Sequence, residues 1–222
     1  NSVYTNDYLN LPSVLSENNA TVLLGIPKLY NVLYKKITKK IENSYLARLI
    51  HKIYPRLLGY IIKRQLGSTD LRFAVSGGAP LSPEVAQGLR KVGIGVYEGY
   101  GLTETSPILT WTKDPFTEKE GSVGEPIPSV KLKLDNSNDK DVKEVLVKGP
   151  NVMQGYYKNE ARTKEVIDEE GWFHTGDSGS LDEENWLYLN GRKKNVIVLE
   201  SGKNVYPEEV EWELERLPYV EE

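Results

Sequence analysis

Residues 71–83 read LRFAVSGGAPLSP and combine three local signals that indicate the fold of the chain. The apolar run at 71–75 has the length of a buried strand. A glycine-rich turn follows at 76–80, and Ser82 as a helix N-cap with Pro83 at the first helical position then predicts a helix. The stretch therefore predicts a strand, a glycine-rich turn and a helix, which is the repeating unit of an α/β fold.

Two further strands are expected around this unit. Residues 21–26 form a short apolar run that ends at Gly and Pro, and residues 94–97 follow a helix that stops at Gly93. Alternating strands and helices indicate a parallel sheet, in which ligands bind at the carboxyl ends of the strands. Both glycine-rich segments, 76–80 and 98–104, are expected at that edge.

Apolar residues recur at helical spacing over residues 29–41 and again over 46–62, which predicts two helices. Residues 11–19 are expected to be a polar segment that leads into the first strand. Between Lys28 and Arg64 there are ten Lys or Arg residues and one acid. The interpretation that we favour is a solvated basic face, and the alternative is contact with an anionic membrane surface or a phosphate-bearing substrate.

Beyond Trp111 the pattern changes to short alternating segments separated by turns, which favours antiparallel β-structure. The fold class expected for the whole chain is therefore α/β followed by antiparallel β. The expected elements are strands at 130–134, 143–148, 186–189 and 195–199, a turn at 135–139, a short helix at 160–166 and a helix that begins at Pro207.

Composition excludes several classes of protein. With 39% hydrophobic residues, the 222-residue chain can form a substantial core. The absence of cysteine excludes disulfides and thiolate metal sites, and fits a cytoplasmic protein. The net charge of -4 argues against general nucleic-acid binding. No apolar run is long enough for a membrane span, and the N-terminus has no secretory signal pattern.

Residues 98–104, EGYGLTE, carry the most chemistry in one short turn. Glycine lets backbone amides approach an anion, a Thr hydroxyl can bond to a phosphate oxygen, a Glu can hold Mg²⁺ and a Tyr can cover a base. The alternative is a glycine-rich turn after a strand, with an exposed Thr103 and Glu104. These residues alone leave both interpretations open.

Three separated motifs, SGGAP at 76–80, YGLTE at 100–104, and GWFHTGD at 171–177 followed by GRKK at 191–194, agree in order and spacing. Together they resemble the adenylate-forming acyl-CoA synthetases, the superfamily that includes firefly luciferase and the adenylation domains of peptide synthetases. Residues 191–211 are most similar to the long-chain fatty acid branch. The resemblance implies that, with Mg²⁺ as cofactor, the carboxylate of a fatty acid attacks the α-phosphate of ATP to give an acyl-AMP and pyrophosphate. The thiol of coenzyme A then displaces AMP.

The resemblance also implies a domain organisation. Residues 1–110 correspond to the parallel-sheet part of the AMP-binding large domain, and residues 111–190 to its distorted β-barrel. Residues 191–222 correspond to the hinge and the beginning of a truncated α+β small domain.

Individual roles follow from the same resemblance. Tyr100 corresponds to the aromatic residue that stacks on adenine, and Gly101 belongs to the same nucleotide-binding motif. Thr103 and Glu104 are the expected catalytic pair, with the hydroxyl on the α-phosphate and the carboxylate on Mg²⁺. The remaining expected site residues are Gly77, Gly78, Ala79 and Pro80 against adenine, Asp177 and Arg192 at the ribose, Lys194 at the hinge and Gly202 in the coenzyme A channel.

His174, within the third motif, is interpreted as an ordinary packed histidine.

Two features of the superfamily do not occur in these 222 residues: a Ser/Thr/Gly-rich phosphate loop that ends in Pro-Lys-Gly, and a catalytic lysine late in the small domain. The expectation is a fragment that does not catalyse adenylation by itself. The alternatives are a non-catalytic AMP-binding module, and an enzyme whose acceptor differs, such as an adenylation domain that loads a carrier protein or a luciferase-like oxygenase.

Overall fold

The computed structural model of the chain describes residues 3–5, 10–65, 69–117, 119–135, 142–199 and 203–215. The chain divides into two compact units, Asn1–Gly99 with Thr112–Gly121, and Tyr100–Trp111 with Ser122–Glu222. The fold class predicted from the sequence, α/β followed by antiparallel β, is confirmed. The three-part domain division at residues 110 and 190 remains a prediction.

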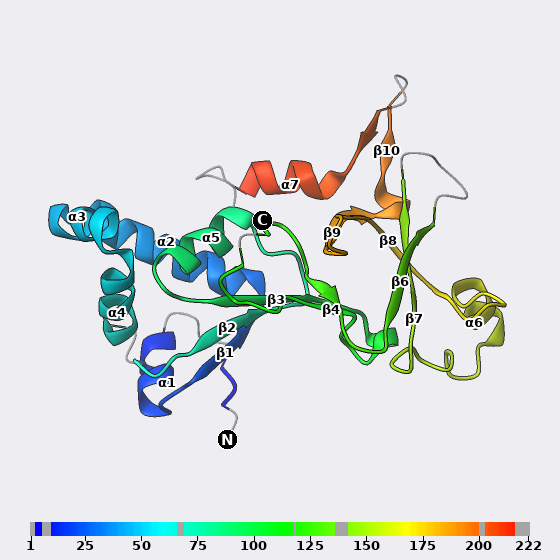
Figure 1. The fold of residues 1–222 in the computed structure, drawn as a ribbon, viewed down its shortest axis with the longest axis horizontal. Coiled ribbons are helices and arrows are strands. Elements are labelled where there is room, and N and C mark those ends of the chain that lie inside the picture. Colours follow the sequence, from blue (N-terminus) through cyan, green and yellow to red (C-terminus); the bar gives the residue numbers. More distant parts are fainter. Residues whose placement is uncertain are drawn as a thin grey trace. The chain divides into compact units, whose positions relative to one another are not determined.

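Three neighbouring parallel strands lie in the first unit (Figure 1). They are β1 (Val22–Gly25), β2 (Phe73–Ser76) and β3 (Val96–Tyr100), with β2 in the middle. The register pairs Gly25 with Ser76 and Ser76 with Glu98. Since parallel neighbours need a long crossover, α5 (Pro83–Lys91) connects β2 to β3 and ends before Gly93, whose φ is +79°. This confirms the strand, turn and helix predicted from residues 71–83.

Helix α2 (Pro27–Glu42) contributes a large part of the first core. Its Tyr30 is fully buried, and the hydroxyl lies 2.9 Å from the Leu23 carbonyl oxygen and 2.7 Å from the Val75 carbonyl oxygen. The helix is therefore tied to both β1 and β2. The other buried apolar residues of this core are Leu11, Leu15, Leu23, Leu29, Leu33, Ile37, Leu58, Ile62, Leu71, Ala74, Leu81, Val85, Ala86, Leu89, Val92, Ile94 and Val96.

Two expectations about helices in this unit were wrong. Residues 11–17 are not a polar segment that leads into the first strand but form α1 (Leu11–Glu17), whose Leu11 and Leu15 lie on one face and are buried. The single helix expected over 46–62 is two helices, α3 (Tyr45–Ile53) and α4 (Pro55–Gln65). Pro55 causes the break in two ways. It lacks the N–H needed for a helical hydrogen bond, and its ring sterically disfavours the helical conformation at Tyr54, which has φ -136° and ψ 67°.

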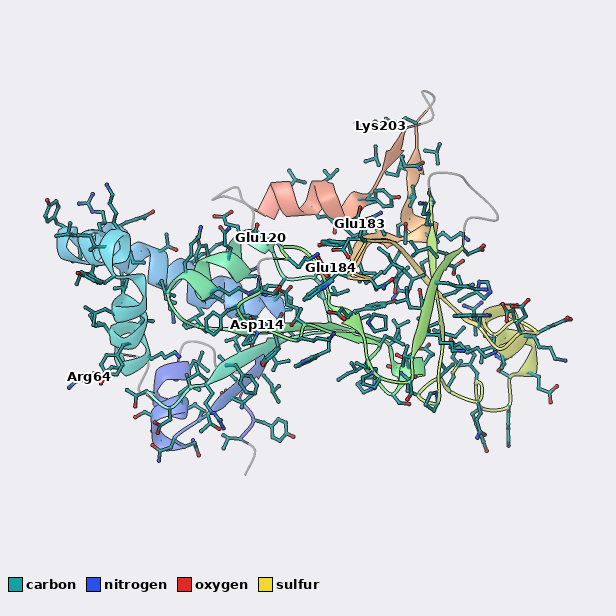
Figure 2. The ribbon with its side chains drawn as sticks, in the orientation of Figure 1. Arg64, Asp114, Glu120, Glu183, Glu184 and Lys203 are labelled. Carbon is teal, nitrogen blue, oxygen red and sulfur yellow. The ribbon has the colours of Figure 1, made fainter. Side chains whose placement is uncertain are left out.

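The segment Thr112–Gly121 belongs to the first unit (Figure 2, Asp114 and Glu120). Its Pro115 carbonyl accepts a hydrogen bond from Val96 N, at 2.8 Å. The buried Arg90 guanidinium donates to the same carbonyl at 3.1 Å and pairs with Glu98 at 2.7 Å. Burial nevertheless raises the pKa of Glu98, because desolvation outweighs the attraction of Arg90.

Antiparallel strands build the second unit (Figure 1). Strands β4 (Thr110–Trp111) and β5 (Glu125–Pro126) pair with each other. A separate four-stranded sheet runs in chain order through β6 (Lys131–Asp135), β7 (Glu144–Lys148), β8 (Phe173–Leu181) and β9 (Leu187–Arg192). Its core is Leu109, Val145, Val147, Phe173 and Leu187. Most of the turn predicted at 135–139 lies outside the described residues.

Shorter elements complete the second unit. The helix predicted at 160–166 is α6 (Glu160–Val166), capped by the Asn159 side chain. The strand expected at 195–199 is shorter, because the 3₁₀ turn η2 (Lys193–Asn195) precedes β10 (Ile197–Val198). Strand β10 pairs with β11 (Asn204–Val205), and α7 (Pro207–Glu215) begins at Pro207 as predicted. Among the described helices, none has both the length and the apolar character needed to cross a membrane.

Candidate functional site

The glycine-rich segment at 98–104 is only partly a turn. Glu98 to Tyr100 continue strand β3, and the turn begins at Gly101. A Cβ atom at Gly101 would lie 1.6 Å from the Pro107 carbonyl oxygen, and Leu109 N donates to the Tyr100 carbonyl at 2.8 Å. Residues 101–108 thus form a closed loop, which we call the acidic loop, and Gly101 is required because the backbone passes directly over it.

Thr105 holds the acidic loop from inside. It is fully buried, and its hydroxyl accepts a hydrogen bond from Leu102 N at 2.9 Å. The loop contains the 3₁₀ turn η1 (Thr103–Thr105), which leaves Thr103 exposed and Glu104 half-buried. The hydroxyl and the carboxylate that the sequence singled out are consequently both on a rigidly closed loop.

Glu104 is fixed by residues that the sequence reasoning missed. The Tyr156 hydroxyl donates to Glu104 Oε1 at 2.9 Å, and Met153 N donates to the Glu104 carbonyl at 2.8 Å. The Asn151 side chain donates to carbonyls of the same loop. Burial, and to a smaller extent the hydrogen bond to Glu104, raises the pKa of the Tyr156 phenol. The signal available in the sequence was weak: polar and aromatic residues around Gly155, between a strand and a helix.

A second cluster joins Tyr100, Asp177 and Arg192. The Tyr100 hydroxyl donates to Asp177 Oδ2 at 2.5 Å, and Arg192 Nε lies 3.0 Å from Asp177 Oδ1. Asp177 and Arg192 face each other in the register of β8 and β9, which explains how residues 15 positions apart meet. We call these three side chains the Asp177 cluster. The cluster brings together three residues that were predicted from the sequence to bind the same nucleotide.

The Asp177 side chain is almost completely buried, with an exposed fraction of 10%. Burial raises its pKa, and the charges of Glu144 and Glu208 act in the same direction, while Tyr100 and Arg192 lower it. Burial and the neighbouring carboxylate also raise the pKa of Tyr100, so the phenol remains a hydrogen-bond donor. The Arg192 side chain is 45% exposed, which leaves its guanidinium open to a ligand.

His174 lies between two carboxylates. Its Nδ1 is 3.5 Å from Glu144 Oε2 and its Nε2 is 3.6 Å from Asp168 Oδ2. Glu144 also pairs with Lys193 at 2.9 Å and accepts a hydrogen bond from Gly176 N at 3.0 Å. These residues could not be connected from the sequence, because β7, β8, η2 and the segment that follows α6 come together only in the folded chain.

The other predicted residues are placed as follows. Gly77 and Gly78 follow β2 in the first unit, and a Cβ atom at either would meet nothing within 4 Å. Gly78 has φ +86°, and Ala79 and Pro80 are exposed. Lys194 is an exposed residue of η2. Gly202 lies outside the described residues.

The donors present fit a magnesium nucleotide better than a protein-caged metal. Among residues that the structure describes, no group of three or more His, Cys, Asp or Glu side chains is arranged to hold a metal ion. Mg²⁺ is usually held by one or two carboxylates together with substrate phosphates, and Glu104 suits that mode. A carboxylate has about four acceptor positions. Asp177 can therefore accept further hydroxyl donors beside Tyr100 and Arg192.

The chain is similar to known enzymes in both sequence and fold. Residues 4–157 match the family described as AMP-binding enzyme. The chain is 33% identical over 98% of its length to the long-chain-fatty-acid–CoA ligase FadD15 of Mycobacterium bovis, and 36% identical over 94% to long chain acyl-CoA synthetase 6, peroxisomal, of Arabidopsis thaliana.

It spans 39% and 34% of the lengths of these two relatives. A solved structure of O-succinylbenzoate coenzyme A synthetase from Bacillus subtilis, in complex with ATP and magnesium, superposes with a TM-score of 0.74 at 26% identity, covering 97% of this chain and 40% of that one. The chain belongs to the family of AMP-binding enzymes.

Proposed function

We propose that this chain is the adenylate-binding part of an ATP-dependent acyl-CoA synthetase, and that the whole protein activates a fatty acid as acyl-AMP and transfers it to coenzyme A. The observation that carries the proposal is the Asp177 cluster, in which a buried carboxylate lies between a phenol and a half-exposed arginine. Similarity to two long-chain ligases and to a synthetase solved with ATP and magnesium supports it.

In this proposal the Asp177 cluster binds the nucleoside. A vicinal diol is well matched by one carboxylate that accepts two hydrogen bonds. Asp177 takes the ribose hydroxyls, Arg192 approaches the same ribose, and the Tyr100 ring stacks on adenine. Because its hydroxyl is bonded to Asp177, the Tyr100 ring is oriented before the base arrives. Gly77, Gly78, Ala79 and Pro80 lie against the adenine.

The acidic loop binds the phosphate. Thr103 is exposed and donates its hydroxyl to an α-phosphate oxygen, and Glu104 holds Mg²⁺. A Mg²⁺ ion held by Glu104 would offset the negative charge that develops when a carboxylate attacks the α-phosphorus. Lys194 is the hinge residue between the large and small domains, and Gly202 lines the coenzyme A channel.

The first test is the binding of AMP to the 222-residue chain, measured by isothermal titration calorimetry. Asp177→Asn is expected to weaken AMP binding at least tenfold, because the amide offers one acceptor oxygen instead of two and loses the charge that Arg192 faces. Glu183→Gln is the matched control, since this residue lies in the turn between β8 and β9 of the same unit (Figure 2). Equal affinities for Asp177→Asn and the wild type would refute the proposed ribose site.

The raised pKa of Asp177 makes a further prediction about pH. Ribose hydroxyls donate to the ionised carboxylate, so AMP affinity should fall as the pH is lowered through the pKa of Asp177, which is raised above the ordinary aspartate value. In Asp177→Asn the residual affinity should not follow this titration. A wild-type affinity with the same pH dependence as that of Asp177→Asn would contradict the assignment.

We further propose that the isolated chain binds nucleotide without catalysing adenylation. No Ser/Thr/Gly-rich loop ending in Pro-Lys-Gly occurs in the 222 residues, so groups for the β- and γ-phosphates are missing from this chain. Each such electrostatic group typically lowers the activation barrier by about 3 kcal/mol. Fatty acid-dependent exchange of pyrophosphate into ATP by the isolated chain would disprove this.

The acyl substrate is proposed to be a medium or long fatty acid. A screen of the full-length protein with short, long and aromatic acids, measuring acyl-CoA formed, would test it. Preference for aromatic acids would contradict the fatty acid assignment. Acyl transfer to a carrier protein in place of coenzyme A would favour the adenylation-domain alternative, and AMP binding without any turnover in the full-length protein would favour the non-catalytic module.

Peripheral contact with an anionic membrane through the basic helices is proposed as a second property. On α3, Tyr45, Leu49 and Ile53 are 77%, 43% and 54% exposed at four-residue spacing, beside the exposed Arg48 and Lys52. An apolar stripe flanked by cations is typical of interfacial helices. Co-sedimentation with phosphatidylglycerol-containing vesicles, but not with pure phosphatidylcholine, is expected for the wild type and not for Leu49→Ser/Ile53→Ser. Equal sedimentation of both proteins would contradict it.

A further inference from the structure

Residues 149–156, between β7 and α6, contact the acidic loop at several points. We propose that this segment, which we call the brace, is a positioning element that orients the Glu104 carboxylate for a magnesium nucleotide. The proposal rests on the proposed function of Glu104 and extends it to Asn151 and Tyr156, residues that do not themselves touch the ligand. Three separate contacts carry it.

The first contact closes the acidic loop. Asn151 Nδ2 donates to the Thr105 carbonyl at 3.0 Å and to the Ile108 carbonyl at 2.8 Å. These two carbonyls lie three residues apart, so one planar amide group fixes both ends of the segment that follows η1. Ser106, between them, has φ +57°, a conformation that a non-glycine residue rarely adopts without support from its surroundings.

The second and third contacts hold Glu104 at both ends. Met153 N donates to the Glu104 carbonyl at 2.8 Å, and the Tyr156 hydroxyl donates to Oε1 of the side chain at 2.9 Å. Backbone and carboxylate are thus held by the same segment. A carboxylate with one oxygen bonded to a phenol has fewer orientations, and partners of this kind commonly tune a metal ligand without touching the metal.

The brace is itself held by α6. Tyr156 N donates to Thr163 Oγ1 at 2.9 Å, and the Thr163 hydroxyl donates to the Asn159 carbonyl at 2.9 Å. Gly155 has φ +154°, and a Cβ atom there would lie 2.8 Å from Thr163. The chain therefore approaches the helix closely at the residue before Tyr156, which places the phenol from a fixed backbone.

Tyr156→Phe tests the carboxylate contact. In the 222-residue chain, AMP affinity should remain within twofold of the wild type, because the Asp177 cluster is intact. The Mg²⁺ concentration for half-maximal enhancement of ATP binding should rise about tenfold, the effect typical of losing an outer partner of a metal ligand. Tyr157→Phe is the matched control, since this neighbouring phenol is 88% exposed. An unchanged magnesium dependence in Tyr156→Phe would overturn the positioning role.

Hydrogen exchange tests the brace without any nucleotide. Asn151→Ala should speed exchange of the Met153 amide about tenfold or more, because the loop that accepts its hydrogen bond is no longer closed. Gln154→Ala, at an exposed position of the same segment, should leave it unchanged. Unchanged Met153 exchange in Asn151→Ala would refute the brace. If the wild type binds neither AMP nor ATP, the proposed function fails, and the exchange experiment still decides whether the brace holds the loop.

Discussion

The two glycine-rich segments that follow β2 and β3 look alike in sequence but use glycine for different reasons. After β2, a side chain at Gly77 or Gly78 would meet nothing within 4 Å, and only Gly78 has a positive φ. After β3, a side chain at Gly101 would meet the Pro107 carbonyl oxygen at 1.6 Å. The first segment is open, whereas the second is closed over its own glycine.

This difference separates stability from binding. Glycines in an open turn leave room for a ligand, so we expect their substitution to act mainly on binding. A glycine under a crossing backbone is a requirement of the fold, and its substitution should act first on stability. Four substitutions test the comparison, in order of decreasing effect on the free energy of unfolding.

Gly101→Ala should have the largest effect. The added methyl group meets backbone atoms, which cannot move aside as a side chain can, and we expect destabilisation of about 3 kcal/mol. All four Trp residues lie in the second unit, so urea denaturation followed by Trp fluorescence reports on this region. A change below about 1 kcal/mol would show that the acidic loop is not closed as described.

Thr105→Val should come next. Valine keeps the shape of this fully buried residue but removes the hydroxyl that accepts from Leu102 N, leaving a buried donor without its partner. The expected cost is about 2 kcal/mol, measured by the same denaturation experiment. The exposed Thr103, changed to Val as a control, should cost less than about 0.5 kcal/mol.

Gly78→Ala should cost about 1 kcal/mol, because an L-residue is strained at φ +86° even in open space. Thermal unfolding followed by circular dichroism is the suitable measurement, since the first unit contains no Trp. Gly78→Asn is a useful second variant, because Asn adopts positive φ more readily and should recover part of the loss. Equal destabilisation by Ala and Asn would point to a steric cause.

Gly77→Ala should have the smallest effect on stability, below about 0.5 kcal/mol, because its surroundings are open and its φ is not positive. AMP binding should nevertheless weaken several-fold if adenine lies against this turn. Calorimetry on the folded variant separates the two effects. An unchanged AMP affinity would remove the turn from the proposed adenine site.

Local signals in the sequence predicted most of the fold. The parallel strands, α2, α5 and α6 have strong periodicity or capping residues, and each was found where expected. The failures have physical causes. At Tyr54 and Pro55 the helical period continues through a position where proline breaks the helix. Leu11, Val14 and Leu15 have helical spacing, but α1 is only seven residues long, too short for periodicity to identify a helix reliably.

For the candidate site, the sequence singled out Tyr100, Asp177 and Arg192, and the structure brings the three into hydrogen-bonding contact. Sequence reasoning missed Asn151 and Tyr156 because their partners lie 46 and 52 positions away. An Asn or a Tyr that only positions another residue also has no sequence motif that indicates this role. The interpretation of residues 98–104 as one turn was also incomplete, since the first three of these seven residues belong to strand β3.

The sequence by itself determined the alternation of strands and helices, the change to antiparallel structure after Trp111 and the identity of the groups suited to a nucleotide, because these depend on residue type and short-range spacing. Only the tertiary structure decided which glycine is open and which is covered, and which side chains hold Glu104 and Asp177. Those properties depend on contacts between segments distant in the chain, and such contacts are set by packing and strand register.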